Sequence, residues 1–247
     1  MLRIPLHIAA ALMLTVLTQI GGLAWLCALI FRRRLIAFVV LYAGFSFAMI
    51  WSAPHFGRVA LSCFADGPLQ VQSPFYCMTN RNYVDPRLAG SLQSIAQEMD
   101  RRHPGTITLV LDANFPLFDG FPLLPHLSHD DGEKVDLAFY YRDDARFLPG
   151  ATRSPVGYFA FERGHTHCPE TWPTLRWDFE PLQPMWRDLS LDEPRNATLL
   201  RLLSDDPAIS RIFVEPHVVE SLDVSSDKIG FQGCRAARHD DHIHLQL

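Results

Sequence analysis

Apolar residues dominate the first 51 positions of the chain, where two uncharged runs stand on either side of an arginine triplet. The run over 4–31 is long enough to span the roughly 30 Å hydrocarbon core of a bilayer, and the run over 35–51 is close to the lower limit for a span. A cleavable signal peptide would begin with positive charge and have a shorter apolar core, whereas here the charge follows a longer run. We therefore predict a two-helix transmembrane hairpin over 1–57, with Arg32 to Arg34 in the cytoplasm and both chain ends across the membrane.

Beyond residue 84 the apolar positions change to the short periodic patterns of an α+β domain, which we assign to 58–247. Asp85 and Pro86 are typical of the cap and first residue of a helix, and the segment from His103 to Gly105 ends it. The apolar residues between them repeat at the spacing of one helical face: Leu88, Leu92, Ile95 and Met99. Similar patterns predict strands over 106–111, 135–141, 211–214 and 242–247, and helices over 194–203 and 216–222.

Charge is distributed as unevenly as hydrophobicity. Residues 1–57 contain four of the 22 Lys and Arg residues and no Asp or Glu, so residues 58–247 hold 18 basic against 27 acidic side chains, a net charge of −9. Proteins that bind nucleic acid contact the phosphate backbone with clustered Lys and Arg. This acidic balance argues against nucleic acid as a partner and favours a solvated domain on a membrane anchor.

Four of the five cysteines lie in the predicted soluble domain, and the fifth, Cys27, lies in the first apolar run. An even number of cysteines on the oxidising side of a membrane favours up to two disulfides, with three possible connectivities. Free buried thiols are the alternative. The four candidates are Cys63, Cys77, Cys168 and Cys234.

Five of the eleven histidines fall into two short clusters, at 126–136 and 239–244. Catalytic zinc commonly takes three protein ligands from His and Asp or Glu and leaves a fourth position to water. Gly132 permits a turn that brings Asp136 back to His129, so that the first cluster offers two ligands. The terminal strand can supply the third. The histidines of the two clusters are His126, His129, His239, His242 and His244.

Neither half of this pattern is specific when taken alone. His242 and His244 stand two apart on a predicted strand and so project from one face, but an H-x-H pair is common. A histidine seven residues before an aspartate is weaker still. The two pairs together, each with another histidine three residues ahead, favour a metal site over a chance arrangement.

Residues 145–190 are rich in Pro, Trp and Arg and show no clean period, so we expect an irregular excursion that could wall a cleft. The excursion contains another compact set of potential ligands, His165, His167 and Cys168. Surface histidines beside a disulfide-bonded cysteine are the simpler interpretation of this set.

The two clusters resemble the metallopeptidases of the lysostaphin and D-Ala-D-Ala group. That group is marked by H-x-x-x-x-x-x-D and H-x-H, and the fuller pattern H-x-x-H-x-x-G-x-x-x-D with H-x-x-H-x-H looks like its penicillin-insensitive murein endopeptidases. The likeness continues in Arg195-Asn196 before a leucine-rich helix and in Asp206-Pro207 before the strand at 211–214. It covers roughly 85–145 and 190–247, whereas the hairpin and the excursion have no counterpart.

The resemblance implies a small antiparallel sheet flanked by helices, with one zinc ion bound by His129, Asp136 and His244. It further implies that His242 faces the reacting centre and that His126 and His239 are auxiliary residues around it. The chain has no H-E-x-x-H motif to place a glutamate as general base. The imidazole of His242 or His239 is the natural substitute because its unperturbed pKa is near ~6.5.

We accordingly expect a membrane-anchored zinc metallopeptidase that hydrolyses amide bonds in the stem-peptide cross-links of peptidoglycan. The hairpin would hold it in the bacterial cytoplasmic membrane, with residues 58–247 on the periplasmic side where this substrate lies. A D,D-carboxypeptidase or dipeptidase of the same group is the nearest alternative. A zinc-containing module that binds the cell wall without cutting it is an alternative of a different class.

Overall fold

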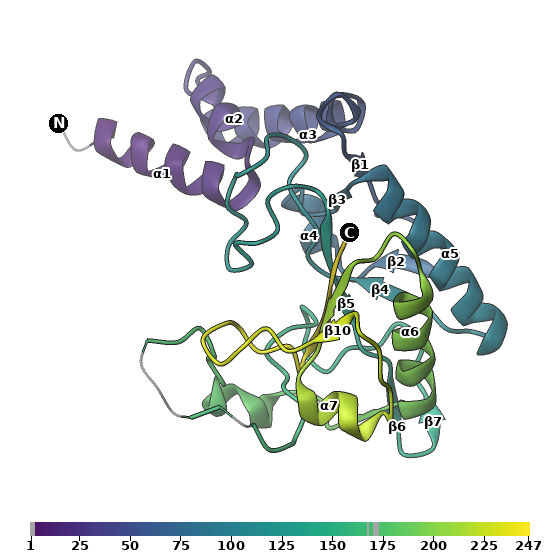
Figure 1. The fold of residues 1–247 in the computed structure, drawn as a ribbon. Coiled ribbons are helices and arrows are strands. Elements are labelled where there is room, and N and C mark those ends of the chain that lie inside the picture. Colours follow the sequence, from purple (N-terminus) through teal and green to yellow (C-terminus); the bar gives the residue numbers. More distant parts are fainter. Residues whose placement is uncertain (1–2, 167, 170–172) are drawn as a thin grey trace.

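The structure is a computed structural model that describes residues 3–166, 168–169 and 173–247 (Figure 1). Three apolar helices lie together at one end of the molecule, and the sheet and its covering helices form the rest. These N-terminal helices are α1 (Arg3–Thr18), α2 (Gly21–Ala28) and α3 (Arg34–Ser52), and α3 continues into the short 3-10 helix η1 (Ala53–Phe56).

The first apolar run is not one helix, so the structure does not confirm a single span over 4–31. The chain turns at Gln19, whose φ of 65° lies in the left-handed region. The side chain of Gln19 accepts a hydrogen bond from the Leu117 N–H at 2.8 Å and donates one to the Leu117 carbonyl at 3.3 Å. Beyond the turn, α2 packs back on α1 so closely that a Cβ at Gly22 would collide with the Thr15 side chain.

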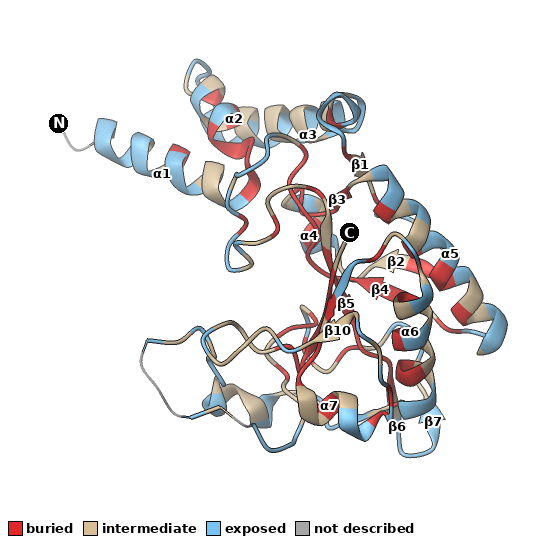
Figure 2. Ribbon diagram, viewed as in Figure 1, coloured by how far each residue is buried: buried red, intermediate tan, exposed pale blue. Residues whose placement is uncertain are grey.

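The second apolar run, over 35–51, is one helix as expected, and it is α3. Residues Arg34–Phe56 form a stretch of 23 residues with a mean hydropathy of 2.0, long and apolar enough to cross a membrane. Its side chains are largely exposed on the protein surface, unlike those of the sheet (Figure 2). It is the one such helix in the described part of the chain, because α1 at 16 residues is only about 24 Å long.

A six-stranded mixed sheet forms the centre of the α+β domain. Its strands run in the order β10–β9–β11–β5–β4–β2, antiparallel through the centre and parallel at each outer pair. The predicted antiparallel sheet is therefore confirmed in the centre, and each edge adds a parallel strand. The strands are β2 (Leu69–Val71), β4 (Thr108–Val110), β5 (Lys134–Ala138), β9 (Arg211–Phe213), β10 (Ile229–Gly230) and β11 (His242–Gln246).

The helices α5 (Pro86–Arg102), α6 (Glu193–Asp205) and α7 (Pro216–Ser221) contribute to the main core. The Asp85 carboxylate caps α5 by accepting a hydrogen bond from the Arg87 N–H, as the sequence predicts. The predicted apolar face of α5 is buried, and so are the alternate side chains of the two central strands. In β5 and β11 these core residues are Val135, Leu137, Ile243 and Leu245.

The alternation along the central strands decides where the histidines point. Because Ile243 and Leu245 enter the core, His242 and His244 project from the opposite face of β11. The same alternation turns Asp136 to that face of β5. In the antiparallel register His244 is directly opposite Asp136, so two of the predicted ligands are neighbours across one strand pair.

The predicted strand over 135–141 ends early. β5 stops at Ala138, and Tyr140 lies in the core with its hydroxyl 2.7 Å from Thr108 Oγ1 instead of sharing the face of Asp136. The cause is Asn196, whose side-chain amide bonds both the N–H and the carbonyl of Tyr140. The N–H and carbonyl of Tyr140 therefore have hydrogen-bond partners without a neighbouring strand, and the strand can end before them.

The remaining elements are short, and the excursion over 145–190 is mostly irregular, as expected. The elements in and next to the excursion are β6 (Tyr141–Asp143), β7 (Arg146–Phe147), η2 (Glu180–Met185) and β8 (Ser190–Leu191). The excursion carries β7 and the start of β8, which pair with β6 on either side in a small antiparallel sheet, and a 3-10 helix. Before the main sheet, β1 (Val59–Ala60) pairs with β3 (Tyr83–Val84), and α4 (Pro74–Met78) lies between them in sequence.

Both predicted disulfides are present. Cys63 pairs with Cys77, and Cys168 pairs with Cys234 across a sequence separation of 66 residues. Cys27 in α2 is unpaired. The first bridge ties the segment before β2 to α4, and the second ties the excursion to the segment before β11. Disulfides persist in oxidising compartments, so the pairings support an extracytoplasmic location for residues 58–247.

Candidate metal centre

The first ligand group brings together a loop and the two central strands. Asp136 comes from β5 and His244 from β11, and His129 approaches from the loop before β5. The loop reverses at Gly132, which has a φ of 88° that an L side chain would not readily adopt. The Gly132 N–H donates to Asn114 Oδ1 at 3.1 Å, which fixes the turn.

The three donor atoms of this group surround a common point. His129 Nε2 lies 3.3 Å from Asp136 Oδ1, His244 Nδ1 lies 2.8 Å from that oxygen, and the two nitrogens are 3.0 Å apart. Donors bonded tetrahedrally to zinc at 2.0–2.1 Å stand about 3.3 Å from one another. The three residues are at most 2% exposed. Their separations and their chemistry therefore fit a metal ion, and the predicted set His129, Asp136 and His244 could hold one.

The neighbours of His129 and His244 turn the right nitrogens inward. His129 Nδ1 lies 2.8 Å from the Ala113 carbonyl, which can only accept a hydrogen bond, so Nδ1 carries the proton and Nε2 keeps its lone pair. The His244 ring turns Nδ1 to the site and places Nε2 3.1 Å from Gln246 Nε2. An amide N–H can only donate, so metal binding through Nδ1 requires the Gln246 amide to present its oxygen to a protonated Nε2. An acceptor such as the Ala113 carbonyl orients the imidazoles that bind metals.

Asp136 is the electrostatic centre of the site. Burial raises the pKa of this carboxyl, but the surrounding histidines, His129 first, outweigh burial and hold that pKa well below its usual value. Asp136 is therefore ionised, as a metal ligand must be. Its other oxygen, Oδ2, accepts a hydrogen bond from the Tyr158 hydroxyl at 2.7 Å.

His242 lies beside the first group and is held by an aspartate. Its Nδ1 stands 2.5 Å from Asp241 Oδ1, and its Nε2 is buried with no hydrogen-bond partner among the described residues. Burial lowers the pKa of His242, but the charges of Asp136 and Asp241 outweigh this and raise it to about 9. Asp241 thus orients the imidazole.

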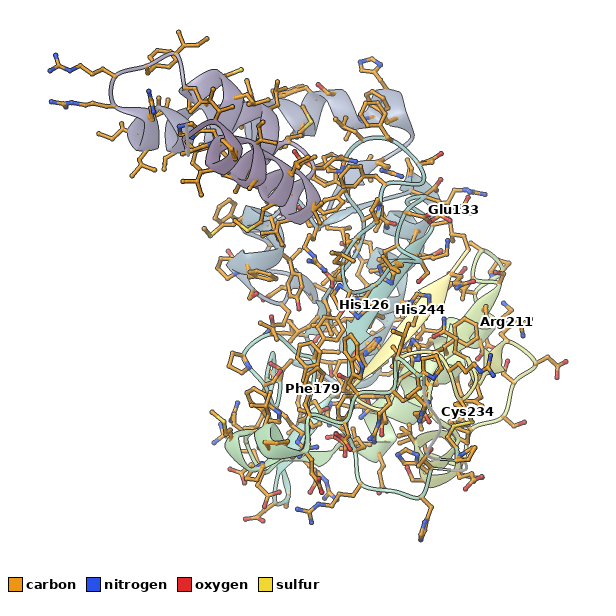
Figure 3. The ribbon with its side chains drawn as sticks, turned by 90° about the vertical axis from the view of Figure 1, so that its left-hand side faces the viewer. His126, Glu133, Phe179, Arg211, Cys234 and His244 are labelled. Atoms are coloured by element: carbon orange, nitrogen blue, oxygen red, sulfur yellow. A yellow bond between two sulfur atoms is a disulfide. The ribbon has the colours of Figure 1, made fainter. Side chains whose placement is uncertain are left out.

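His239 and His126 also lie at the site, and each ring is next to that of His242. The His239 ring is centred 4.9 Å from that of His242, and burial, followed by the positive charge of His242, lowers the pKa of His239 well below its usual value. His126 Nδ1 lies 2.9 Å from Asp112 Oδ2 and 3.2 Å from Asp136 Oδ2. All six predicted site residues therefore gather in one place, and Figure 3 labels two of them, His126 and His244.

A cleft opens on the side of His126 and His242. The excursion supplies much of its wall, which is largely aromatic. Trp177 is half exposed, and the rings of Phe159 and Phe179 meet edge to face at 5.0 Å. The cleft is lined by Pro125, His126, Tyr158, Phe159, Phe161, Leu175, Trp177, Phe179, Ala237, Arg238, Asp241 and His242.

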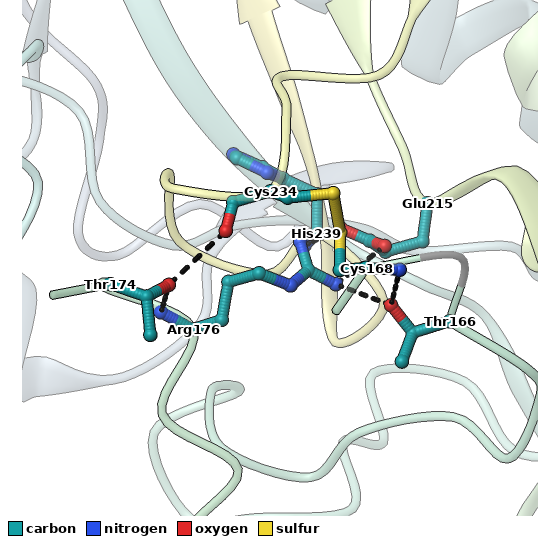
Figure 4. Close-up of a disulfide and its surroundings, with 7 residues drawn as sticks. All are labelled: Thr166, Cys168, Thr174, Arg176, Glu215, Cys234 and His239. Atoms are coloured by element: carbon teal, nitrogen blue, oxygen red, sulfur yellow. Dashed lines mark hydrogen bonds and ion pairs between the residues drawn. A yellow bond between two sulfur atoms is a disulfide. The ribbon is translucent and has the colours of Figure 1, made fainter. Parts of the chain in front are cut away.

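The Cys168–Cys234 disulfide holds the excursion to the segment that leads into β11 (Figure 4). Nearby, both terminal nitrogens of Arg176 donate to the Glu215 carboxylate at 2.9 and 2.8 Å. The predicted alternative ligand set is not supported as a metal site among the described residues. Its cysteine is in the disulfide, His165 is exposed, and His167 lies outside the described residues.

Three further residues lie around the site, in contacts that local spacing does not predict. Tyr158 belongs to the irregular excursion, where no period indicates its direction. Asp112 follows β4 and is paired with Arg81 through two contacts of 2.5 Å. Asp240 turns away from the histidine rings of the metal group and binds Arg238. Long-range pairs such as Arg81 with Asp112 leave no signal in local spacing.

Comparisons with known proteins place this geometry in no family. No protein-family model matches the chain, and no curated protein is significantly similar to it.

Proposed function

We propose that the chain is a membrane-anchored zinc peptidase that hydrolyses amide bonds in the stem-peptide cross-links of peptidoglycan. One observation carries the proposal: three buried donors, His129, Asp136 and His244, converge on one point beside a cleft that two further imidazoles line. A purely structural metal site has no need of such a cleft, because structural zinc sites are closed by four protein ligands.

Zinc is the metal that suits this set. Two imidazoles and one carboxylate leave an open position, the arrangement of catalytic zinc, whereas Mg²⁺ and Ca²⁺ prefer oxygen donors. When bound, zinc would polarise the scissile carbonyl and lower the pKa of a water molecule toward ~7.

The residues around the metal group supply the rest of the chemistry. His242 lines the cleft, and Asp241 holds its Nδ1 so that Nε2 is directed to the site. We assign to His242 or His239 the exchange of protons with the substrate, and to the other the stabilisation of the oxyanion. His126 lines the same side and contacts Asp112 and Asp136, which suits an auxiliary role.

The substrate assignment rests on the resemblance and on location. The motif H-x-x-H-x-x-G-x-x-x-D with H-x-x-H-x-H resembles murein endopeptidases. The apolar helix α3 follows the arginine triplet, and the two disulfides suit an oxidising compartment. This supports a two-span hairpin, or one span through α3, that places the cleft outside the cytoplasmic membrane, close to peptidoglycan.

Two other functions suit the same site less well. A D,D-carboxypeptidase or dipeptidase would use the same metal and histidines on a shorter substrate. A non-catalytic wall-binding module would not need the His242 imidazole oriented by Asp241 and left without a partner at Nε2.

The test is product analysis on defined muropeptides. Full-length protein in detergent, stripped of metal and restored with zinc, should convert cross-linked dimers to monomers. His242→Ala should lose this activity while keeping the metal, and His103→Ala, at an imidazole bonded to Thr198 away from the site, should keep both. Release of a terminal D-alanine alone would indicate the carboxypeptidase. Unchanged metal content in His129→Ala and His244→Ala would contradict the ligand assignment.

A further inference from the structure

The Asp136 carboxylate faces two pairs of histidines, one with each oxygen. Oδ1 lies 3.3 Å from His129 Nε2 and 2.8 Å from His244 Nδ1. Oδ2 lies 3.2 Å from His126 Nδ1 and 3.6 Å from His242 Nε2. The proposed function uses the first pair as ligands and leaves the second pair unbound.

The second pair has the donor geometry of a cation site in its own right. One donor atom each from His126, Asp136 and His242 lies within 4.8 Å of the others. The separation of 3.6 Å between His242 Nε2 and Asp136 Oδ2 is too long for a hydrogen bond but near the roughly 3.3 Å edge of a tetrahedron around zinc.

His242 provides the independent observation that points to a ligand. It is 2% exposed, and its Nε2 has no hydrogen-bond partner among the described residues. A buried polar atom without a partner is unfavourable, because it has lost its hydrogen bonds to water and gained none. Its other nitrogen is bonded to the Asp241 carboxylate, the arrangement that fixes the tautomer of metal-binding histidines.

We propose that His126, Asp136 and His242 form a second, weaker zinc site, with Asp136 bridging the two ions, and that its occupation inhibits the peptidase. The inference rests on the proposed function, because inhibition follows from the loss of His242 Nε2, a group assigned there to the reaction. Paired ions in metalloenzymes stand about 3.5–4 Å apart.

The second site is expected to fill after the first. His126 has a side chain that is 14% exposed and lines the open cleft, whereas His129 and His244 are almost fully buried. Two dications that share one carboxylate also repel each other. The carboxylates of Asp112 and Asp241, which lie 2.9 Å from His126 Nδ1 and 2.5 Å from His242 Nδ1, offset part of this repulsion.

Metal stoichiometry tests the inference without reference to activity. We expect full-length protein, equilibrated with buffered free zinc and analysed by mass spectrometry, to bind two equivalents, the second at least about tenfold more weakly. His126→Gln and His242→Gln should each bind one equivalent, and His103→Ala should bind two. Circular dichroism establishes that each variant is folded.

The zinc dependence of the reaction is the second readout. Muropeptide cleavage should rise with the first equivalent and fall with the second, and excess zinc should not inhibit the residual activity of His126→Gln. One equivalent in the wild type at every zinc concentration overturns the second site and leaves the proposed function standing. No bound zinc at all overturns both. Two equivalents in His126→Gln and His242→Gln overturn the assignment of the ligands.

Discussion

The direction of the His242 imidazole is set by one carboxylate, which makes Asp241 a positioning residue. Asp241 Oδ1 lies 2.5 Å from His242 Nδ1, and Oδ2 accepts a hydrogen bond from the Phe159 N–H at 2.6 Å. Asp241→Asn keeps the shape but removes the charge that orients the ring. We expect kcat to fall about 10–100-fold, with KM, melting temperature and the first equivalent of zinc unchanged.

The adjacent aspartate provides the matched control. Asp240 is bound by Arg238 and lies 3.5 Å from His217, and it makes no hydrogen bond with His242. Asp240→Asn should therefore lower the melting temperature and leave kcat nearly unchanged. Equal losses of kcat in the two variants would show that Asp241 has only a structural role.

At this scale the sequence predicts the donors better than their surroundings. The spacing of His129 and Asp136 around Gly132 identifies a ligand pair because a local turn brings them together. The alternation in β11 likewise places His242 and His244 on one face. Tyr158 could not be predicted, since it reaches Asp136 from an aperiodic segment 22 residues away.

At the scale of elements, Arg58 joins the end of the apolar N-terminal helices to the loop that carries His126 and His129. Its side chain is 1% exposed and donates to the Phe115 carbonyl at 2.7 Å, to Asp119 at 2.7 Å and to the Asp130 carbonyl at 3.1 Å. Arg58→Ala leaves these acceptors unpaired. We expect a loss of about 3 kcal/mol in stability and faster release of zinc, measured by thermal unfolding and chelator competition.

Two further variants, Arg87→Ala and Arg58→Lys, serve as controls for Arg58→Ala. Arg87 is 66% exposed and contacts Asp85 and Glu133 on the surface, so Arg87→Ala should change stability by less than about 0.5 kcal/mol. Arg58→Lys keeps the charge but not the planar set of donors and should be intermediate. A normal rate of zinc release in Arg58→Ala would contradict the idea that Arg58 couples the apolar N-terminal helices to the loop that carries His129.

The elements themselves show which patterns suffice for prediction. The cap at Asp85 and the apolar face behind it predict α5 because both signals are local. The first apolar run is divided into two helices by a turn that depends on a distant contact, that of Gln19 with Leu117. The adjacent Gly21 and Gly22 are a local signal that weakens a helix prediction at this point.

For the whole molecule, the break between α1 and α2 is compatible with two membrane topologies. Both place the cleft on the same side of the membrane. In both, Arg32 to Arg34 stay in the cytoplasm and α3 carries the chain outward. A true hairpin over 1–57 places Met1 outside as well. If α3 alone crosses, α1 and α2 stay on the cytoplasmic side and Met1 lies inside.

Reporter fusions distinguish these topologies. We expect a phosphatase that needs an oxidising compartment to be active after Leu247 and inactive when inserted after Arg33. Activity of the same reporter ahead of Met1 then separates the hairpin, where it is active, from the single span, where it is inactive. The fusion after Leu247 is the stronger test of the proposed function, because the two disulfides and an extracytoplasmic substrate require residues 58–247 to be outside. Activity after Arg33 and none after Leu247 would contradict the location proposed for the cleft, whatever α1 and α2 do.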